Sequence, residues 1–256
     1  MNDKVSSSVS EGVFRLEILR PGKKNALTAE MYAAMADALD AAEADTGVRV
    51  ILIHGSAGTF TAGNDLGDFL AKPPTDENAP VFRFINGFAK LKKPFVAAVE
   101  GVAVGVGTTL LLHCDLVYAG ASARFVLPFV NLGLTPEAAS SLLLPQRVGH
   151  VRATEMLMLG EPFSAKTALE AGLINAIVPD GEVIGHALAV CKKLAAQPAA
   201  SIRLTKQLLK QTQSALVSQA MHNENLIFKE RLQSPEAKEA FSAFFEKRRP
   251  DFSKFD

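Results

Sequence analysis

The chain has no excess of charge of either sign, because Lys and Arg together number 27 and so do Asp and Glu. This balance gives no indication of a nucleic-acid surface, so an anionic partner would need a local basic cluster. Cysteine is scarce as well. Cys114 and Cys191 stand far apart in apolar surroundings without metal or redox spacing. We therefore expect two buried, inert thiols.

Long apolar runs are also missing. The uncharged stretch GVAVGVGTTLLLHC (101–114) is too short to span a bilayer and is predicted to be a buried core segment. The first residues, MNDKVSSSVSEG, contain no apolar signal core and are expected to form a frayed tail. These absences predict a protein of the reducing cytoplasm that does not bind membranes.

Several catalytic signatures are absent from the sequence: the phosphate-binding G-x-x-x-x-G-K-[ST], the zinc-binding H-E-x-x-H and the EF-hand loop. The run GVAVGVG is similar to a dinucleotide-binding loop but lacks the third glycine and a following acidic partner, so it is weak evidence for NAD. The five histidines show no ligand spacing. No metal site is predicted.

Strand and helix patterns alternate over roughly the first 180 residues. Strands are predicted at 13–19, 48–55, 92–101, 114–120 and 123–128. Helical patterns lie between them, after Thr28 and near 80–91 and 105–113. This alternation indicates an α/β class.

The character of the chain changes after Pro179. Residues 182–249 are predicted to form three helices, broken near Pro198, Gln213 and Ser234. Earlier, AKPPTDENAP (71–80) is a polar, proline-rich loop. With 256 residues, the chain is expected to form one large domain or a core with an appendage.

Two glycine-rich turns follow predicted strands: FTAGNDLGDF (60–69) and EGVAVGVGTTLLL (100–112). Small residues let the backbone approach a ligand closely, and N–H groups are free where a helix begins. If the turns face one another, they can donate two backbone N–H groups to one developing oxyanion. Taken singly, each turn is better explained as an ordinary tight strand-to-helix connection.

Glu137 is the only charged residue between Phe125 and Gln146. The segment TPEAASS has the pattern of a helix start, with Thr135 as the cap and Pro136 at the first position. Glu137 could then serve the helix macrodipole. Alternatively, an apolar pocket raises its pKa toward neutrality and fits it for proton transfer. The segment alone leaves both readings open.

Further motifs follow one another in a fixed order: KKNALTAEM (23–31), FTAGNDL, EGVAVGVGTTLLLHCDLVYA, PFVNLGLTPEAASSLLLPQRVG, AKTALEAGLINAIV and FSAFFEKRRPDF. In this order and spacing the chain resembles the enoyl-CoA hydratase/isomerase, or crotonase, superfamily from about Val13 to the carboxyl terminus. The resemblance implies an α/β spiral of β-β-α units with a C-terminal helical region used in trimer formation. It places the spiral core and acyl-CoA site in residues 1–195, and the helical region for oligomerisation and CoA contact in residues 196–256.

The resemblance also implies an acyl-CoA thioester substrate, no separate cofactor, and a homotrimer or a dimer of trimers. Two backbone donors to the thioester oxygen fall on Asn64 and on Val106, which replaces the middle glycine of the usual triple-glycine turn. Contacts with the substrate or its CoA are implied for Lys24, Ala26, Ala62, Gly63, Asp65, Leu66, Gly105, Phe129, Phe244 and Lys247. Lys23, Arg248 and Arg249 are further basic residues available to the CoA phosphates.

The choice of reaction depends on carboxylates. Hydratases of the family use two glutamates, and the matching positions here hold Thr109 and Phe129. AGNDL together with LGLTPEAASS resembles the peroxisomal-type Δ3,Δ2-enoyl-CoA isomerases, whose single catalytic glutamate falls on Glu137. The first expectation is thus an isomerase that shifts a double bond from Δ3 to Δ2. The alternatives are a hydratase, another crotonase-type lyase or hydrolase, and a non-catalytic acyl-CoA-binding member.

Overall fold

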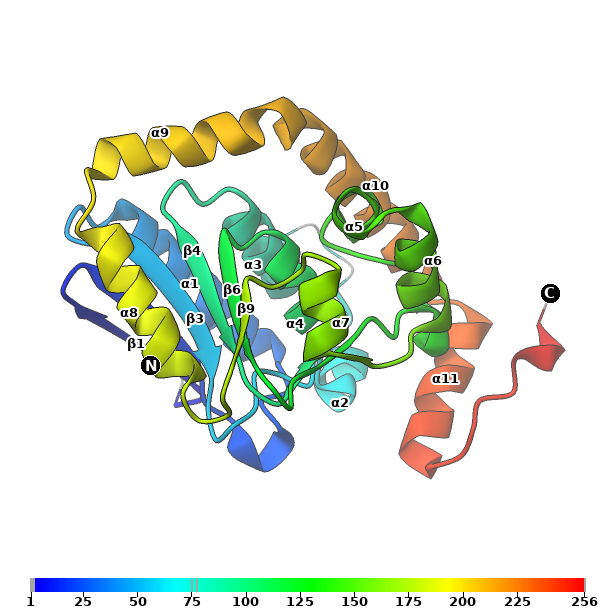
Figure 1. Cartoon of the computed structure of the whole chain (residues 1–256). Helices are drawn as coiled ribbons and strands as arrows, with labels where there is room; N and C mark the ends of the chain where they lie inside the picture. Colours follow the sequence, from blue (N-terminus) through cyan, green and yellow to red (C-terminus); the bar gives the residue numbers. More distant parts are fainter. Residues whose placement is uncertain (1–2, 75, 77, 256) are drawn as a thin grey trace.

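The protein is described by a computed structural model that covers residues 3–74, 76 and 78–255 (Figure 1). Within these residues, a six-stranded sheet has the order β1-β2-β3-β4-β6-β9. The pair β1 and β2 is antiparallel and all other neighbours are parallel. The strands are β1 Val5–Ser10, β2 Val13–Ile18, β3 Val50–Gly55, β4 Phe95–Val99, β6 Leu116–Gly120 and β9 Ala176–Val178.

A second sheet of three short strands has the order β5-β7-β8, with β5 at Val102–Val104, β7 at Arg124–Val126 and β8 at Phe163–Ser164. Strands β5 and β7 each follow a strand of the first sheet directly and pair with one another in parallel. The chain therefore turns from one sheet to the other twice, as in a spiral of β-β-α units. The predicted α/β class is confirmed.

Helices cover both faces of the large sheet, as parallel strands require. The helices are α1 Ala29–Ala44, α2 Leu66–Ala71, α3 Pro80–Ala89, α4 Val106–Thr109, α5 Ser140–Val148, α6 His150–Leu159, α7 Ala165–Glu170, α8 Val183–Ala195, α9 Ala199–Lys210, α10 Ser214–Leu232 and α11 Pro235–Glu246. All six residues of β3 are buried: Val50 and Leu52 pack in the core beneath α8, while Ile51 and Ile53 belong to the larger core on the other face. Period-2 alternation thus divides one strand between two cores.

The amino-terminal segment corrects a prediction. Residues 1–12 were expected to form a frayed tail, but Val5–Ser10 is β1 and pairs with β2 along its whole length. Glu11 and Gly12 both have positive φ, at 51° and 74°, and connect Ser10 to Val13 as a two-residue hairpin turn. This strand is held by backbone hydrogen bonds to β2, and most of its side chains are exposed. No apolar pattern therefore marks it in the sequence. Residues 1–2 lie outside the described residues.

The C-terminal region contains one more α-helix than predicted. Within the described residues the segment 183–246 forms four helices, α8 to α11, because each of the three breaks separates two helices. In Figure 1, α9 leaves the core and α10 runs back toward α5 and α6. The predicted boundary at residue 195 coincides with the end of α8, although the division into two domains stays a prediction.

Two smaller expectations concern the loop and membrane passage. The polar loop 71–80 lies between the end of α2 and the start of α3, and residues 75 and 77 within it are outside the described residues. Of the helices that the structure describes, none combines the length and apolar character needed to cross a membrane.

Candidate functional site

The segment 24–27 and the first glycine-rich turn lie side by side. Ala62 N–H donates to the Lys24 carbonyl (2.9 Å), Leu27 N–H to the Gly63 carbonyl (2.8 Å), and Asp65 N–H to the Leu27 carbonyl (2.8 Å). The structure therefore brings Lys24, Ala26, Ala62, Gly63 and Asp65 together, and their contacts with a substrate stay a prediction. Lys24 is exposed at this edge.

Asn25, whose side chain is fully buried, holds this double layer of loops. Its amide group donates to the Ser56 and Thr59 carbonyls (3.1 and 2.6 Å) and accepts from Arg20 N–H (2.8 Å) and the Ser56 hydroxyl. Its backbone carbonyl accepts from the Thr61 hydroxyl (2.7 Å). Asn25 has a φ of 56°, a conformation that asparagine tolerates better than most residues.

The second turn lies directly against the first. Thr61 N–H donates to the Val102 carbonyl (2.9 Å) and Val104 N–H to the Thr61 carbonyl (3.0 Å). A Cβ added to Gly63, whose φ is 81°, would lie 2.8 Å from the Val104 carbonyl oxygen, so only glycine permits this approach. The two turns thus meet, as an oxyanion-binding pair requires.

Val106 is the first residue of α4 and follows Gly105, whose φ is 55°. Among residues 3–74, 76 and 78–255, the backbone N–H groups of Asn64 and Val106 donate to no other group. Both are therefore available to a ligand. Because the Val106 side chain is buried, it packs inward, and replacing the usual glycine leaves the N–H in place.

Glu137 does not lie in a helix, which corrects the predicted helix start at Thr135. The helix α5 begins at Ser140, since Ala138 and Ala139 both adopt φ of 56° and interrupt the helical path. The Thr135 hydroxyl accordingly caps no helix. This excludes the alternative in which Glu137 occupies the first turn and serves the helix macrodipole.

The carboxyl group of Glu137 is buried, with 4% of the residue exposed. The Thr109 hydroxyl, on α4, donates to its Oε1 at 2.9 Å. Burial raises the pKa of Glu137 to about 7; the Thr109 hydrogen bond opposes that rise and the charge of Glu224 adds to it. The side chain can therefore exist in both protonation states near neutral pH, as a general acid/base must.

Tyr32, on α1, contacts the first turn and lies within the electrostatic influence of Glu137. Its hydroxyl donates to the Asn64 side-chain oxygen. Burial, and after it the charge of Glu137, raise the pKa of Tyr32 well above its ordinary value. Tyr32 thus stays protonated and helps to fix the turn that carries the Asn64 N–H.

Asp65 and Leu66 begin the next element. The Asp65 side chain caps α2 by accepting from Asp68 N–H (3.1 Å), and it pairs with Arg20 at 2.7 Å. Burial alone would raise the pKa of Asp65, but hydrogen bonds from Arg20 and the Asp68 backbone outweigh burial and lower it. Leu66 is the first residue of α2, and Phe129, 6% exposed, lies just before the Glu137 segment.

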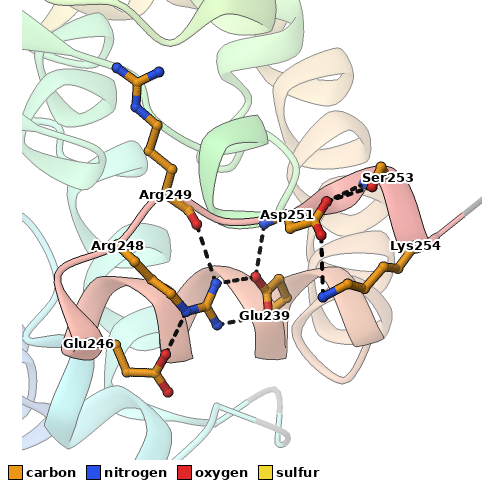
Figure 2. Close-up of polar contacts among 7 residues, drawn as sticks. All are labelled: Glu239, Glu246, Arg248, Arg249, Asp251, Ser253 and Lys254. Atoms are coloured by element: carbon orange, nitrogen blue, oxygen red, sulfur yellow. Dashed lines mark hydrogen bonds and ion pairs between the residues drawn. The ribbon is translucent and has the colours of Figure 1, made fainter.

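Phe244 and Lys247 stand at the end of α11, where Phe244 is exposed and Lys247 ends the helix with a φ of 55°. Figure 2 shows how the tail beyond is fixed: Arg248 donates to Glu239 and Glu246, and Asp251 N–H donates to Glu239 at 2.8 Å. The structure does not join Phe244 or Lys247 to the Glu137 segment, and Lys247 forms no ion pair within the described part of the chain.

Sequence reasoning missed Asn25, Tyr32, His113 and Glu224. His113 has its Nε2 2.7 Å from the Ala138 carbonyl, next to Glu137. Burial lowers the pKa of His113 to about 4, so the ring is neutral and donates this hydrogen bond. Glu224 did have a signal, since a glutamate stands within the apolar helical spacing of residues 221, 228 and 232.

Two meeting backbone turns with free N–H groups, next to a buried carboxyl of raised pKa, define a site of the kind that stabilises an enolate and moves a proton. The enoyl-CoA hydratase/isomerase family model matches residues 8–254. The chain belongs to this family, whose members act on acyl-CoA thioesters.

Known relatives span the chain. A 1,2-epoxyphenylacetyl-CoA isomerase from Escherichia coli is 35% identical over 99% of both chains, and a 2,3-dehydroadipyl-CoA hydratase from the same organism is 34% identical over 96% of both. The crystal structure of an enoyl-CoA hydratase/isomerase from Pseudoalteromonas atlantica superposes with a TM-score of 0.93 at 42% identity, covering 98% of this chain and 100% of that one. The expected crotonase-type fold is confirmed, and the relatives include both isomerases and hydratases.

Proposed function

We propose that the protein is an enoyl-CoA isomerase that shifts a double bond from Δ3 to Δ2 with Glu137 as its single acid/base. The supporting observation is the pairing of a buried Glu137 with the hydroxyl of Thr109, at a position where hydratases of the family hold one of their two glutamates. Phe129 occupies the other such position and is buried too. One carboxyl is thus available for proton transfer.

The reaction needs one proton removed from C2 and one returned at C4 of the acyl chain. Ionised Glu137 takes the C2 proton, which leaves a thioester dienolate, and the protonated carboxyl then delivers a proton to C4. Its pKa of about 7 suits both steps. No metal or redox cofactor takes part in this sequence.

The backbone N–H groups of Asn64 and Val106 would donate to the thioester oxygen as it gains charge. One such donor typically lowers a barrier by about 3–4 kcal/mol. Burial around Glu137 and Phe129 keeps water from protonating the dienolate. The same burial disfavours a hydratase, which must bring an activated water to this point.

We further propose that Lys24, Lys247 and Phe244 contact the CoA moiety and that the protein is a homotrimer or a dimer of trimers. Helix α9 supports the assembly, because Leu204, Leu208 and Leu209 are more than half exposed on it. Leu204 and Leu209 also line a groove of about 1350 Å³ between α3, α9 and α10. Exposed apolar area of this kind marks a surface that another chain covers.

The direct test is incubation of the purified protein with a 3-enoyl-CoA, with product formation followed by the absorbance of conjugated 2-enoyl-CoA. Wild type should isomerise it and should hydrate 2-enoyl-CoA slowly or not at all. The E137Q variant should lose turnover yet keep its circular dichroism spectrum and CoA binding. E155Q, which neutralises an exposed glutamate on α6, is the matched control and should retain activity.

Rapid hydration of 2-enoyl-CoA by wild type would favour a hydratase instead. Ligand binding without turnover of any acyl-CoA would favour a non-catalytic member. Full activity in E137Q would exclude the one-base mechanism.

A further inference from the structure

Glu224 is a buried carboxylate that the proposed mechanism does not use. It lies on α10, with 7% of the residue exposed, in the row of buried residues formed by Met221, Glu224, Phe228 and Leu232. The other three members are apolar, as expected for a helix face that packs on a core. A charged group in such a row is costly unless it is fully hydrogen-bonded.

Three donors from one short segment satisfy Glu224. Ala139 N–H donates to Oε2 at 2.6 Å, and both the N–H (2.9 Å) and the hydroxyl of Ser141 donate to Oε1. These N–H groups lie at the start of α5, whose cap residue Ala139 has no side-chain acceptor. Glu224 therefore caps α5 from another helix and meets the positive end of its dipole.

The segment that Glu224 holds is the one that carries Glu137. Ala138 and Ala139 both have a φ of 56°, the left-handed conformation, which is unfavourable for an L-residue with a side chain. Such backbone persists only where its surroundings fix it. Two contacts do so: His113 donates to the Ala138 carbonyl, and Glu224 accepts from the next N–H.

Among the described residues, the titratable and hydrogen-bonding groups around Glu137 come from four elements. They are Tyr32 on α1, Thr109 on α4, His113 after the short turn that follows α4, and Glu224 on α10. Tyr32 and His113 are neutral at pH 7, since burial raises the pKa of the first and lowers that of the second. Burial raises the pKa of Glu224, while the three hydrogen bonds that its two oxygens accept from Ala139 and Ser141 oppose that rise and favour the ionised form, so Glu224 remains as the charged neighbour.

We propose that Glu224 is a positioning residue, which fixes the backbone next to Glu137 and places a negative charge near its carboxyl group. The two glutamates therefore have separate tasks: Glu224 stays ionised and caps α5, and Glu137 exchanges a proton. This inference rests on the proposed function, because it takes Glu137 as the acid/base. It also makes the docking of the C-terminal helix α10 a condition for a competent site.

The test compares E224Q with wild type by two measurements. The first is the pH dependence of kcat/KM. The second is an infrared titration of the Glu137 carboxyl band, identified by its loss in E137Q, which needs no turnover. Removing the charge of Glu224 should lower the midpoint of both titrations by about half a pH unit or more. The lost contact to the loop should also lower kcat about tenfold. E230Q, which neutralises an exposed glutamate on the same helix, is the matched control and should shift neither titration midpoint.

A fall in kcat without any shift of the midpoint would show a merely structural role and overturn the inference, as would an E224Q variant identical to wild type. If wild type lacks isomerase activity, the proposed function fails, and the infrared titration alone decides this inference. If E224Q does not fold, the same substitution is measured in an Ala139→Gly background, compared with A139G alone, because glycine adopts the left-handed conformation without strain.

Discussion

The Thr109 hydroxyl donates a hydrogen bond of 2.9 Å to the Glu137 carboxylate, and it does so from the first turn of the helix that begins at Val106. One short helix thus carries both the proposed oxyanion donor and the partner of the proposed acid/base. Because Val106 and Thr109 both lie on this helix, the oxyanion donor and the acid/base are held at a fixed separation. The hydrogen bond also gives Thr109 a role at a position where hydratases of the family hold a glutamate, because its hydroxyl binds the Glu137 carboxylate.

Thr109→Val removes the hydroxyl and keeps the shape of the side chain. Because the hydrogen bond favours the ionised form, its loss should raise the pKa of Glu137 further. The acid limb of kcat/KM, near pH 7 in wild type, should move upward by about half a unit to one unit. A pH profile checks this, and an acid limb that stays in place or moves down would contradict the assigned role of Thr109.

Val106→Pro deletes one backbone N–H at the first position of a helix, where proline is tolerated. If this N–H stabilises the dienolate, kcat should fall by about 10²–10³ while the KM changes less. Val106→Ala keeps the N–H and is the control. Similar activities of the proline and alanine variants in steady-state assays would count against Val106 as a donor.

The stability of the protein should also report the proton on Glu137. The carboxyl has a pKa of about 7 in the folded chain. A glutamate in an unfolded chain has a pKa of about 4.3. Between that pH and about 7, the folded state therefore keeps a proton that the unfolded state has lost. The free energy of unfolding therefore falls as pH rises from about 4.3 to 7, by on the order of 3 kcal/mol from this residue.

The E137Q variant has no proton to lose at this position, so its free energy of unfolding should not fall in this way as pH rises. Urea denaturation should find the variant more stable than wild type at pH 8 and about equal to it at pH 4. A variant less stable than wild type at pH 8 would mean that Glu137 is ionised at little cost and that its pKa is not raised.

Asn25→Ala should destabilise the loops without touching the reacting atoms. The substitution leaves the part-buried Thr59 carbonyl and Arg20 N–H without their amide partner and removes one of the two donors to the Ser56 carbonyl. Each unpaired buried group costs about 1–3 kcal/mol. Urea denaturation should show a loss of several kcal/mol, whereas a loss below 1 kcal/mol would deny Asn25 this role.

The parts of the fold that follow from periodicity were predictable, and the exceptions depend on contacts that side-chain periodicity does not record. The strand Val50–Gly55 and the helix capped by Thr28 have clear apolar patterns, and both are confirmed. The strand Val5–Ser10 depends on backbone pairing with exposed serines, so no side-chain pattern marks it. The start of α5 was misjudged because TPEAASS fits a helix in composition, whereas Ala138 and Ala139 interrupt it under the control of distant residues.

The same distinction applies to the candidate site: features with a distinctive local composition were predictable, and contacts between remote segments were not. The two glycine-rich turns and Glu137 could be found from the sequence, since each has a distinctive local composition. Tyr32, His113 and Glu224 come from remote segments, and their contacts with the site arise only in the folded chain. The CoA contacts of Phe244 and Lys247 stay predictions.

Lys247→Ala tests one of these contacts. If the ammonium group binds a CoA phosphate, the dissociation constant for CoA should rise about two- to tenfold, and the effect should shrink at high salt. The control is Lys238→Ala, which removes an exposed charge from the same helix. Equal affinities of the two variants in isothermal titration calorimetry would exclude Lys247 from the binding site.

The most direct test of the single-base mechanism is to follow the transferred hydrogen. A 3-enoyl-CoA labelled with deuterium at C2 is converted in ordinary water in a single turnover, and the product is examined by mass spectrometry and NMR. One buried carboxyl that removes and returns the same hydrogen predicts a measurable fraction of product with deuterium at C4. Product wholly free of deuterium at C4 would contradict proton transfer through Glu137 alone.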